Sequence, residues 1–359
     1  MMMEKITDIN IESYSPVISP DNLVRELPLS DKVIETVSYS RSIIRDILDK
    51  KDKRLLIITG PCSIHDKEAA IEYALKLKAL SEKVESRFFI VMRVYFEKPR
   101  TSIGWKGLIN DPCLDGSCDI ESGLRIAREI LLEINELGVP AATEMLDTIS
   151  PQYFADLISW SAIGARTTES QTHREMVSGL SMPVGLKNGT DGDLMIAING
   201  IKASAYPQKF IGIDGMGRTS IIQTKGNPYT HVVLRGGIRP NYDSFSISST
   251  INLLKKNNLR ESIIIDCSHG NSSKDYSIQP RVWQDVINQR MDGNDSITGL
   301  MLESNIHEGN QPVCAVPKDL RYGVSITDAC ISWEMTEDLI FSTYKYLEEN
   351  SRNNGRYKY

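Results

Sequence analysis

The sequence predicts an α/β protein, a (β/α)8 TIM barrel with an N-terminal extension, and three observations lead to this class. Short apolar runs alternate with helical patterns, which is typical of a parallel sheet buried on both faces. The chain of 359 residues has room for eight such β/α units. No glycine-rich dinucleotide fingerprint follows the first run, so a barrel is favoured over an open doubly wound sheet. The eight runs are LLIITG (55–60), FFIVMR (88–93), PAATEM (140–145), SAIGA (161–165), PVGLKN (183–188), HVVLRG (231–236), SIIIDCSH (262–269) and ITGLMLES (297–304).

The segments outside these runs predict an extension and one insertion. Residues 1–30 are polar and contain three prolines, so we expect an arm, and an amphipathic helix from about Asp31 to Asp49 should follow. Asp66 is a plausible N-cap for a helix that reaches about Ser81. Two β-rich runs around DGMG predict a β-hairpin within 210–224, inserted before the sixth barrel strand. We therefore divide the chain into an extension, 1–50, and a barrel domain, 51–350.

Composition excludes several classes of protein. The formal net charge of −6 argues against a nucleic-acid or anionic-membrane binder, because such proteins usually carry a basic excess. No apolar run reaches the roughly 20 residues that a membrane-spanning helix needs, and the N-terminus has no signal-peptide pattern. We expect a cytoplasmic protein whose six cysteines are thiols or, in one case, a metal ligand.

The ends of the predicted strands carry a first group of chemically active residues. In a TIM barrel the chemistry lies at the carboxyl ends of the strands, so side chains far apart in sequence meet there. The group combines a thiolate, an imidazole and two carboxylates: Cys62, His269, Glu303 and Asp328. Such a set suits Mn, Fe, Co, Cu or Zn better than Mg or Ca. Singly, a cysteine in a Gly-Pro-Cys turn or a loop histidine is more often structural, so the prediction depends on convergence at one rim.

The second group is a ring of cations in a net-acidic protein. Singly, each would be interpreted as a solvated surface charge, but all are predicted to lie on the same barrel rim. Convergent arginines and lysines need anionic partners, and a phosphate with a carboxylate is the natural occupant. The members are Arg93, Lys98, Arg100, Arg166, Lys187 and Arg235.

Long motifs in order along the chain resemble one enzyme family. They are GPCSIHD (60–66), RVYFEKPRTSIGWKGLINDP (93–112), GARTTESQTHRE (164–175), GLKNGTDG (185–192), LRGG (234–237), DCSHGNSSKDY (266–276) and SITDAC (325–330). Together they resemble the microbial type I 3-deoxy-D-arabino-heptulosonate-7-phosphate (DAHP) synthases that aromatic amino acids regulate. The resemblance runs from the N-terminal arm to about residue 340.

The resemblance implies a reaction and a site. The family condenses phosphoenolpyruvate with erythrose 4-phosphate, the first step of the shikimate pathway, and uses one divalent metal ion. By resemblance Cys62, His269, Glu303 and Asp328 hold the metal, and Arg100 with Thr101 binds the phosphate of erythrose 4-phosphate. The phosphoenolpyruvate site is then Arg93, Lys98, Gly164, Ala165, Arg166, Lys187 and Arg235. Candidate catalytic residues are Lys98, Lys187, His269 and Glu144, with Lys98 as the acid near the aldehyde oxygen and the base left open.

The resemblance also implies feedback regulation and self-association. The family's regulatory cavity lies outside the barrel, between the N-terminal extension, the hairpin and nearby helices. Phenylalanine-sensitive members carry serine where this chain has Gly212, and glycine leaves space for a phenolic hydroxyl, so we expect tyrosine as the effector. The family suggests a homo-oligomer, either a dimer or a tetramer. Positions that match the cavity are Pro151, Gln152, Leu180, Phe210, Gly212 and Ile222.

Three other functions stay open from the sequence. A related synthase could use a longer sugar phosphate such as arabinose 5-phosphate, although the motif KPRTS (98–102) favours the four-carbon aldehyde. A Schiff-base aldolase could use Lys187. A barrel without activity could serve only to bind an aromatic amino acid. The hairpin 210–224 could likewise be an oligomer contact, with or without a regulatory role.

Overall fold

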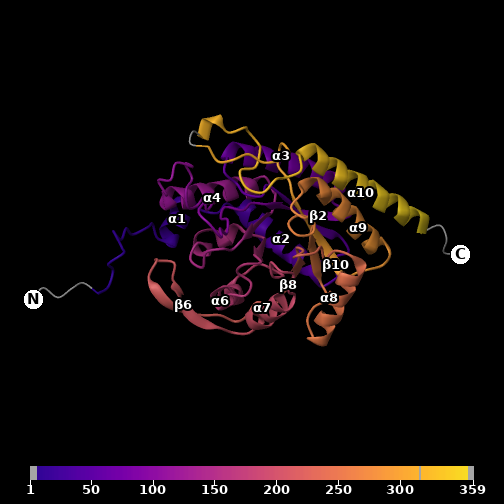
Figure 1. Cartoon of the computed structure of the whole chain (residues 1–359), viewed down its shortest axis with the longest axis horizontal. Helices are drawn as coiled ribbons and strands as arrows, with labels where there is room; N and C mark the ends of the chain where they lie inside the picture. The colour runs from indigo at the N-terminus through magenta and orange to yellow at the C-terminus, as the bar shows by residue number, and fades with distance from the viewer. Residues whose placement is uncertain (1–5, 315–316, 355–359) are drawn as a thin grey trace, which may run out of the picture.

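Eight parallel strands close into a barrel in the computed structural model, which describes residues 6–314 and 317–354. The strand order around the barrel is β1-β10-β9-β8-β5-β4-β3-β2, and Figure 1 shows the helices arranged around it. Each predicted apolar run overlaps one barrel strand, so the TIM-barrel prediction is confirmed. The strands are β1 (Leu55–Gly60), β2 (Phe88–Arg93), β3 (Ala141–Glu144), β4 (Trp160–Ile163), β5 (Val184–Lys187), β8 (Thr230–Leu234), β9 (Ile263–Asp266) and β10 (Ile297–Glu303).

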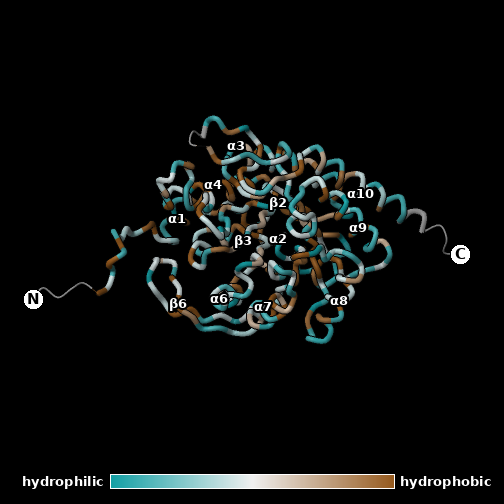
Figure 2. Tube along the Cα trace, in the orientation of Figure 1, coloured by the Kyte–Doolittle hydropathy of each residue, from teal (hydrophilic) through white to brown (hydrophobic). Residues whose placement is uncertain are grey.

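The outer layer consists of helices that bury one face against the strands. Hydrophobic stretches run through the middle of the molecule, and polar positions gather on its outer helices and loops (Figure 2). Asp66 accepts a hydrogen bond from the main chain of Ala69, 3.0 Å away, so the predicted N-cap is confirmed. No helix in the described ranges is long and apolar enough to cross a membrane. The helices are α3 (Lys67–Val84), α4 (Ile120–Glu136), α5 (Pro151–Phe154), α6 (Gln171–Gly179), α7 (Met195–Ala205), α8 (Ser244–Lys256), α9 (Gln279–Met291) and α10 (Trp333–Asn354).

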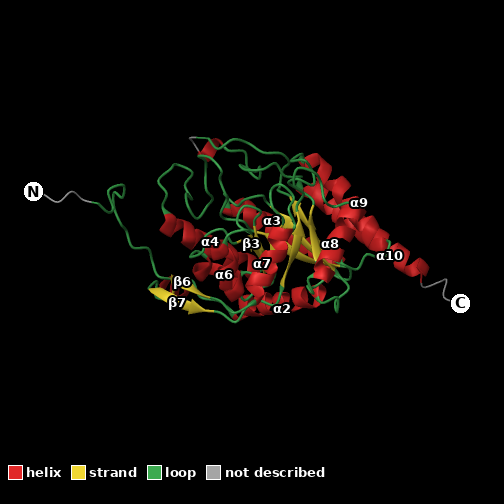
Figure 3. Cartoon of the chain, turned by 60° about the horizontal axis from the view of Figure 1, so that its bottom comes forward, coloured by secondary structure: helices red, strands yellow, loops and turns green. Residues whose placement is uncertain are grey.

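Helix α2 (Asp31–Leu48) closes the amino-terminal end of the barrel. Its apolar face buries Ile44, Ile47 and Leu48 in one cluster with inward-facing strand residues such as Leu56 and Trp160. Figure 3 shows α2 passing beneath the strands. Because this end is filled with apolar side chains, the open carboxyl end is left for ligands.

The prediction that residues 1–30 form an arm outside the core is partly wrong. A short helix, α1 (Pro20–Glu26), begins with proline at its first turn and buries Leu23 completely. The buried guanidinium of Arg128 on α4 donates to the carbonyl of Leu27, directly after α1, at 2.9 Å. The polar composition and the prolines of residues 1–30 did not indicate α1, because this helix buries only Pro20 and Leu23. The domain boundary at residue 50 stays a prediction.

The inserted hairpin is confirmed. Strands β6 (Lys209–Ile213) and β7 (Thr219–Gln223) pair antiparallel outside the barrel. The turn of the hairpin contacts α1, where the main chain of Asp21 donates to the carbonyl of Gly215 at 2.7 Å. The hairpin therefore joins the N-terminal extension to the body of the barrel.

Arg128 should contribute strongly to stability, because it links α4 to three other segments. It donates to the carbonyls of Leu27 and Tyr153 and makes two 2.8 Å bonds to the carboxylate of Asp156. Arg128→Ala should lower the free energy of unfolding by about 3 kcal/mol, because it removes four hydrogen bonds of a fully buried guanidinium and leaves the buried carbonyl of Tyr153 without this donor. Urea denaturation measures this loss.

Arg125 provides the matched control one turn away on α4. Its bond to Glu26 joins side chains that are 35% and 50% exposed, so Arg125→Ala should cost less than about 1 kcal/mol. Equal losses in the two variants would contradict the role assigned to Arg128.

Candidate active site

A cavity of about 370 Å³ opens at the carboxyl end of the barrel. Its lining comes from the ends of β2, β3, β4, β5, β8, β9 and β10 or from the loops that follow them, as the fold predicts. The predicted site residues in the lining are Lys98, Arg100, Glu144, Gly164, Ala165, Arg166, Lys187, Arg235, His269, Glu303 and Asp328.

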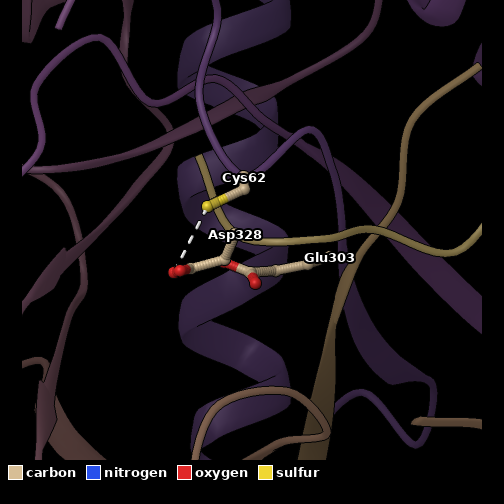
Figure 4. Close-up of side chains that lie close together, drawn as sticks. All are labelled: Cys62, Glu303 and Asp328. Carbon is tan, nitrogen blue, oxygen red and sulfur yellow. Dashed lines mark hydrogen bonds between the residues drawn. The ribbon is translucent and has the colours of Figure 1, made fainter. Parts of the chain in front are cut away.

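Cys62, Glu303 and Asp328 converge at the floor of this cavity (Figure 4). One potential ligand atom of each lies within 4.8 Å of the others, and Cys62 Sγ is 3.7 Å from Asp328 Oδ2. Burial and the nearby carboxylate of Glu303 raise the pKa of the Cys62 thiol to about 11. A bound cation would therefore displace a proton from this sulfur.

His269 faces the same cluster from the loop after β9. Its Nε2 lies 3.7 Å from Glu303 Oε1. Its Nδ1 is engaged by Ser268 Oγ at 2.6 Å and by Asp266 Oδ2 at 3.0 Å. A carboxylate behind an imidazole fixes which ring nitrogen is presented forward, as is common for metal-binding histidines. The backbone of His269 is in the left-handed region, with φ of 57°, which is rare without glycine.

Two cations, the half-buried Lys98 and the buried Arg93, compensate the charge of the cluster. Lys98 donates to Cys62 Sγ at 3.0 Å, and Arg93 donates to Glu303 Oε1 at 2.8 Å with both side chains at most 3% exposed. Burial lowers the pKa of Lys98, but Cys62 and Glu303 outweigh it and raise that pKa above its usual range. For Asp328, burial is likewise outweighed, here by Lys98 and His269, and its pKa is lowered. The converging group is the sulfur and the two carboxylates, and the imidazole of His269 lies outside it, within 3.7 Å of Glu303. One soft sulfur, two carboxylates and a nearby imidazole are ligand types that fit a borderline divalent metal ion.

The remaining basic residues of the cavity differ in what they contact. Lys187 is paired with Asp266 at 3.1 Å, and both are buried. Lys98 forms no salt bridge either, but its ammonium donates to Cys62. Among the described residues, four further cations in the lining form no salt bridge and are available to anions: Arg100, Arg166, Arg235 and Lys274.

Two charged residues of the site, Asp266 and Lys274, were not predicted as site residues from the sequence. Asp266 holds both Lys187 and His269, and its place at the end of β9 was a usable signal. Lys274 follows in the same loop with φ of 63°, and nothing in its local sequence indicates that it faces the cavity.

The carboxylate of Glu144, at the end of β3, lies against the main chain of Gly164, directly after β4. One oxygen of the buried Glu144 carboxylate has no hydrogen-bond partner among the described residues. A Cβ atom at Gly164 would lie 2.3 Å from this oxygen, so a side chain there would push the carboxylate away. The residue at 164 must therefore be glycine for Glu144 to lie at the edge of the cavity.

Two of the predicted substrate-binding residues do not line the cavity. Arg93 lies beneath it and donates to the carbonyls of Pro61 and Cys62 as well as to Glu303. Thr101 is exposed in the loop after β2, next to Arg100, whose Nε donates to the carbonyl of Trp105. Their roles in substrate binding stay predictions.

The predicted regulatory residues lie on the hairpin and on two neighbouring helices. Phe210 pairs with Ile222 across the hairpin, and a Cβ atom at Gly212 would lie 2.4 Å from Ile222 Cδ1. Pro151 begins α5 and Gln152 follows it, whereas Leu180 ends α6. At the base of the hairpin, the hydroxyls of Ser178 and Thr224 lie 2.7 Å apart, which attaches the hairpin to α6.

Comparison with known proteins identifies the family. The profile of the DAHP synthetase I family matches residues 26–340. A Tyr-sensitive phospho-2-dehydro-3-deoxyheptonate aldolase from Salmonella typhimurium is 54% identical over 97% of this chain and 98% of the relative. A Phe-sensitive enzyme of the same name from Escherichia coli is 50% identical over 93% of this chain and 95% of the relative's length. The solved structure of the Francisella tularensis enzyme matches with a TM-score of 0.91 and 47% identity, covering 94% of this chain and 98% of that one. The chain therefore belongs to the DAHP synthetase I family.

Proposed function

We propose that this enzyme condenses phosphoenolpyruvate with erythrose 4-phosphate and water to give DAHP and inorganic phosphate, at the entry to the shikimate pathway. The observation that carries the proposal is one cavity that combines a thiol, carboxylate and imidazole cluster with four cations free of salt bridges. Two polyanionic substrates would repel each other strongly without such cations. Family membership supports the same reaction.

Cys62, His269, Glu303 and Asp328 would hold one divalent metal ion, of which Mn, Fe, Co, Cu and Zn suit the ligands. When bound, such an ion supplies Lewis acidity that polarises the carbonyl of the aldehyde. Arg93 compensates the charge of Glu303, because the two side chains form a buried ion pair at 2.8 Å. Asp266 holds the imidazole of His269 with Nε2 toward the ligands.

The substrates would be divided between two sides of the cavity. Lys98, Arg166, Lys187 and Arg235, with the main chain at Gly164 and Ala165, would bind phosphoenolpyruvate, and Arg93 would support that site from beneath. Arg100 and Thr101 lie in the loop after β2 and would bind the phosphate of erythrose 4-phosphate, with Lys98 near its aldehyde oxygen. Fixing both substrates face to face replaces an encounter in solution with a reaction inside one complex.

The bond changes then assign roles to two further groups. C3 of phosphoenolpyruvate attacks the aldehyde carbon, and Lys98 donates a proton to the resulting oxygen. Positive charge develops at C2 and water adds there, oriented by the unpartnered oxygen of Glu144. The hemiketal then loses inorganic phosphate by cleavage of its carbon–oxygen bond.

The alternatives predict different assays. An aldolase that uses Lys187 needs a free nucleophilic amine, but this amine donates to Asp266 and is buried. Borohydride should therefore trap no covalent adduct.

The other two alternatives are tested by turnover. If the enzyme is specific for the four-carbon aldehyde, arabinose 5-phosphate should be turned over much more slowly than erythrose 4-phosphate. A barrel that serves only to bind an amino acid would release no phosphate.

Removal of the metal site should abolish the reaction. We expect phosphate release from the two substrates to cease with a chelator and to return with Mn²⁺. Cys62→Ala should lower kcat by roughly a hundredfold or more, because polarisation of the carbonyl contributes several kcal/mol. Cys113→Ala removes an exposed thiol and should leave the rate unchanged. Full activity of Cys62→Ala in the presence of chelator would contradict the proposed metal site.

We also propose that tyrosine inhibits the enzyme by binding near the hairpin. Relatives that are named Tyr-sensitive support this effector. Gly212→Ser should raise the tyrosine concentration for half inhibition by roughly tenfold, because the added side chain would meet Ile222 and take up space that a ligand at the hairpin would need. Gln223→Ala alters an exposed position of the same hairpin and should leave inhibition unchanged. Strong inhibition by phenylalanine alone in the wild type would refute the choice of tyrosine.

Finally, we propose a cytoplasmic homo-oligomer, a dimer or a tetramer, in which the hairpin is a contact surface. Ile211 and Ile221 form a cross-strand pair that is 77% and 72% exposed, which is unusual for paired isoleucines on a strand surface. The double variant I211R/I221R should reduce the mass measured by light scattering. Leu75→Arg on α3 is the control, and equal masses for all three proteins would exclude the hairpin contact.

A further inference from the structure

Three loops of the rim meet with their main chains in direct contact. A Cβ atom on Gly236 would lie 2.3 Å from the carbonyl carbon of Gly270, and one on Gly237 would lie 2.3 Å from the nitrogen of Gly192. Side chains at these positions would separate the loops that follow β5, β8 and β9. Arg235 lies directly before this contact, so the packing of the loops determines where its guanidinium can reach.

Asn188 fixes the main chain on both sides of this contact. Its side chain is fully buried directly after Lys187. Its Oδ1 accepts from the main-chain nitrogen of Arg235 at 2.9 Å, and its Nδ2 donates to the carbonyl of Gly236 at 2.9 Å. One amide from the β5 loop therefore holds the main chain at Arg235 and at the next residue.

Asn241 and Asn271 continue the network. Asn241 Oδ1 accepts from the main chain of Gly236 at 2.8 Å, and Asn241 Nδ2 donates to Asn188 Oδ1 at 3.2 Å. The Oδ1 of Asn271 accepts from the main chain of Asn241 at 2.8 Å, and its Nδ2 donates to the carbonyl of Asp266 at 2.9 Å. The amides thus connect the main chain at Arg235 to Asp266, whose carboxylate pairs with Lys187 and His269.

We infer that Asn188, Asn241 and Asn271 are positioning residues that fix Arg235 to receive the phosphate of phosphoenolpyruvate. The inference deepens the proposed function and depends on it. Among the described residues the guanidinium of Arg235 makes one hydrogen bond, from Nη1 to the carbonyl of Gly236 at 3.3 Å, and no salt bridge. The side chain is therefore left to the ligand, while neighbouring loops fix its main chain.

The chemistry of the amide explains why these positions are not acidic. An amide both donates and accepts, so it satisfies main-chain N–H and C=O groups on different loops at once. It carries no charge that would pair with Arg235 and compete with a phosphate. A carboxylate at position 188 could not donate to the carbonyl of Gly236, and it would add negative charge close to the phosphate-binding residue.

Asn241→Ala tests the inference, because Asn241 is only half-buried and its loss should not prevent folding. The measurement is steady-state phosphate release, together with calorimetric binding of phosphoenolpyruvate alone. We expect the KM and Kd for phosphoenolpyruvate to rise roughly five- to tenfold, with kcat and the KM for erythrose 4-phosphate within about twofold of the wild type. Such a split indicates lost ground-state binding at one substrate only.

Asn227→Ala is the matched control at the opposite end of the barrel. Asn227 is more deeply buried than Asn241, and its amide likewise bonds to the main chain: it joins the carbonyls of Leu180 and Met182 to the main chain of Tyr229. Its loss should lower Tm without changing the KM for phosphoenolpyruvate.

Two results would overturn the positioning role: an unchanged KM and Kd for phosphoenolpyruvate in Asn241→Ala, or an equal rise in Asn227→Ala. A wild-type protein that releases no phosphate from the two substrates would instead overturn the proposed function, and this inference with it.

Discussion

The structure of the site depends on burying charges only in opposite pairs. Arg93 and Glu303 meet at 2.8 Å beneath the cavity, on strands that both pair with β1. Removing either partner would leave a charge uncompensated in a nearly dry interior, at a cost of several kcal/mol. This pair places the Glu303 carboxylate, with its charge compensated, next to Cys62 and His269. The metal-binding prediction therefore depends on a residue that lies behind the ligands.

The same principle divides the cations of the rim into two kinds. Arg93 and Lys187 are paired with acids and stabilise the framework, whereas Arg166, Arg235 and Lys274 form no salt bridge among the described residues. The cavity thus has a charge-balanced floor and a positively charged wall. A net-acidic protein can in this way bind two phosphorylated substrates, because local charge rather than net charge decides what the cavity attracts.

Much of the fold and the cluster could be predicted from the sequence, because strand ends in a barrel converge by geometry. The eight apolar runs predicted the strands, and the two β-rich runs around DGMG predicted the hairpin. The meeting of Cys62, Glu303 and Asp328 follows from the convergence of the strand ends. Helix α1 could not be predicted, since its stability comes from tertiary contacts such as that of Arg128 with Leu27.

The residues that orient the site, such as Asp266 and Asn188, could not be predicted from the sequence either. Which carboxylate holds Lys187, or which asparagines join adjacent loops, depends on side-chain directions that strand position alone does not determine. Loops are held by such individual contacts, whereas strands follow a repeating pattern. The ligands could therefore be proposed from residue type and strand position, and the residues that orient them required coordinates.

Four side chains from distant parts of the chain are proposed to enclose one cation beside the substrate cavity. Anomalous diffraction from crystals grown with Mn²⁺ and phosphoenolpyruvate would locate this cation. We expect one anomalous peak in contact with Cys62 Sγ, His269 Nε2, Glu303 and Asp328, with the phosphate of the substrate near Arg235. A peak bound elsewhere, or a substrate outside the cavity, would contradict this proposal.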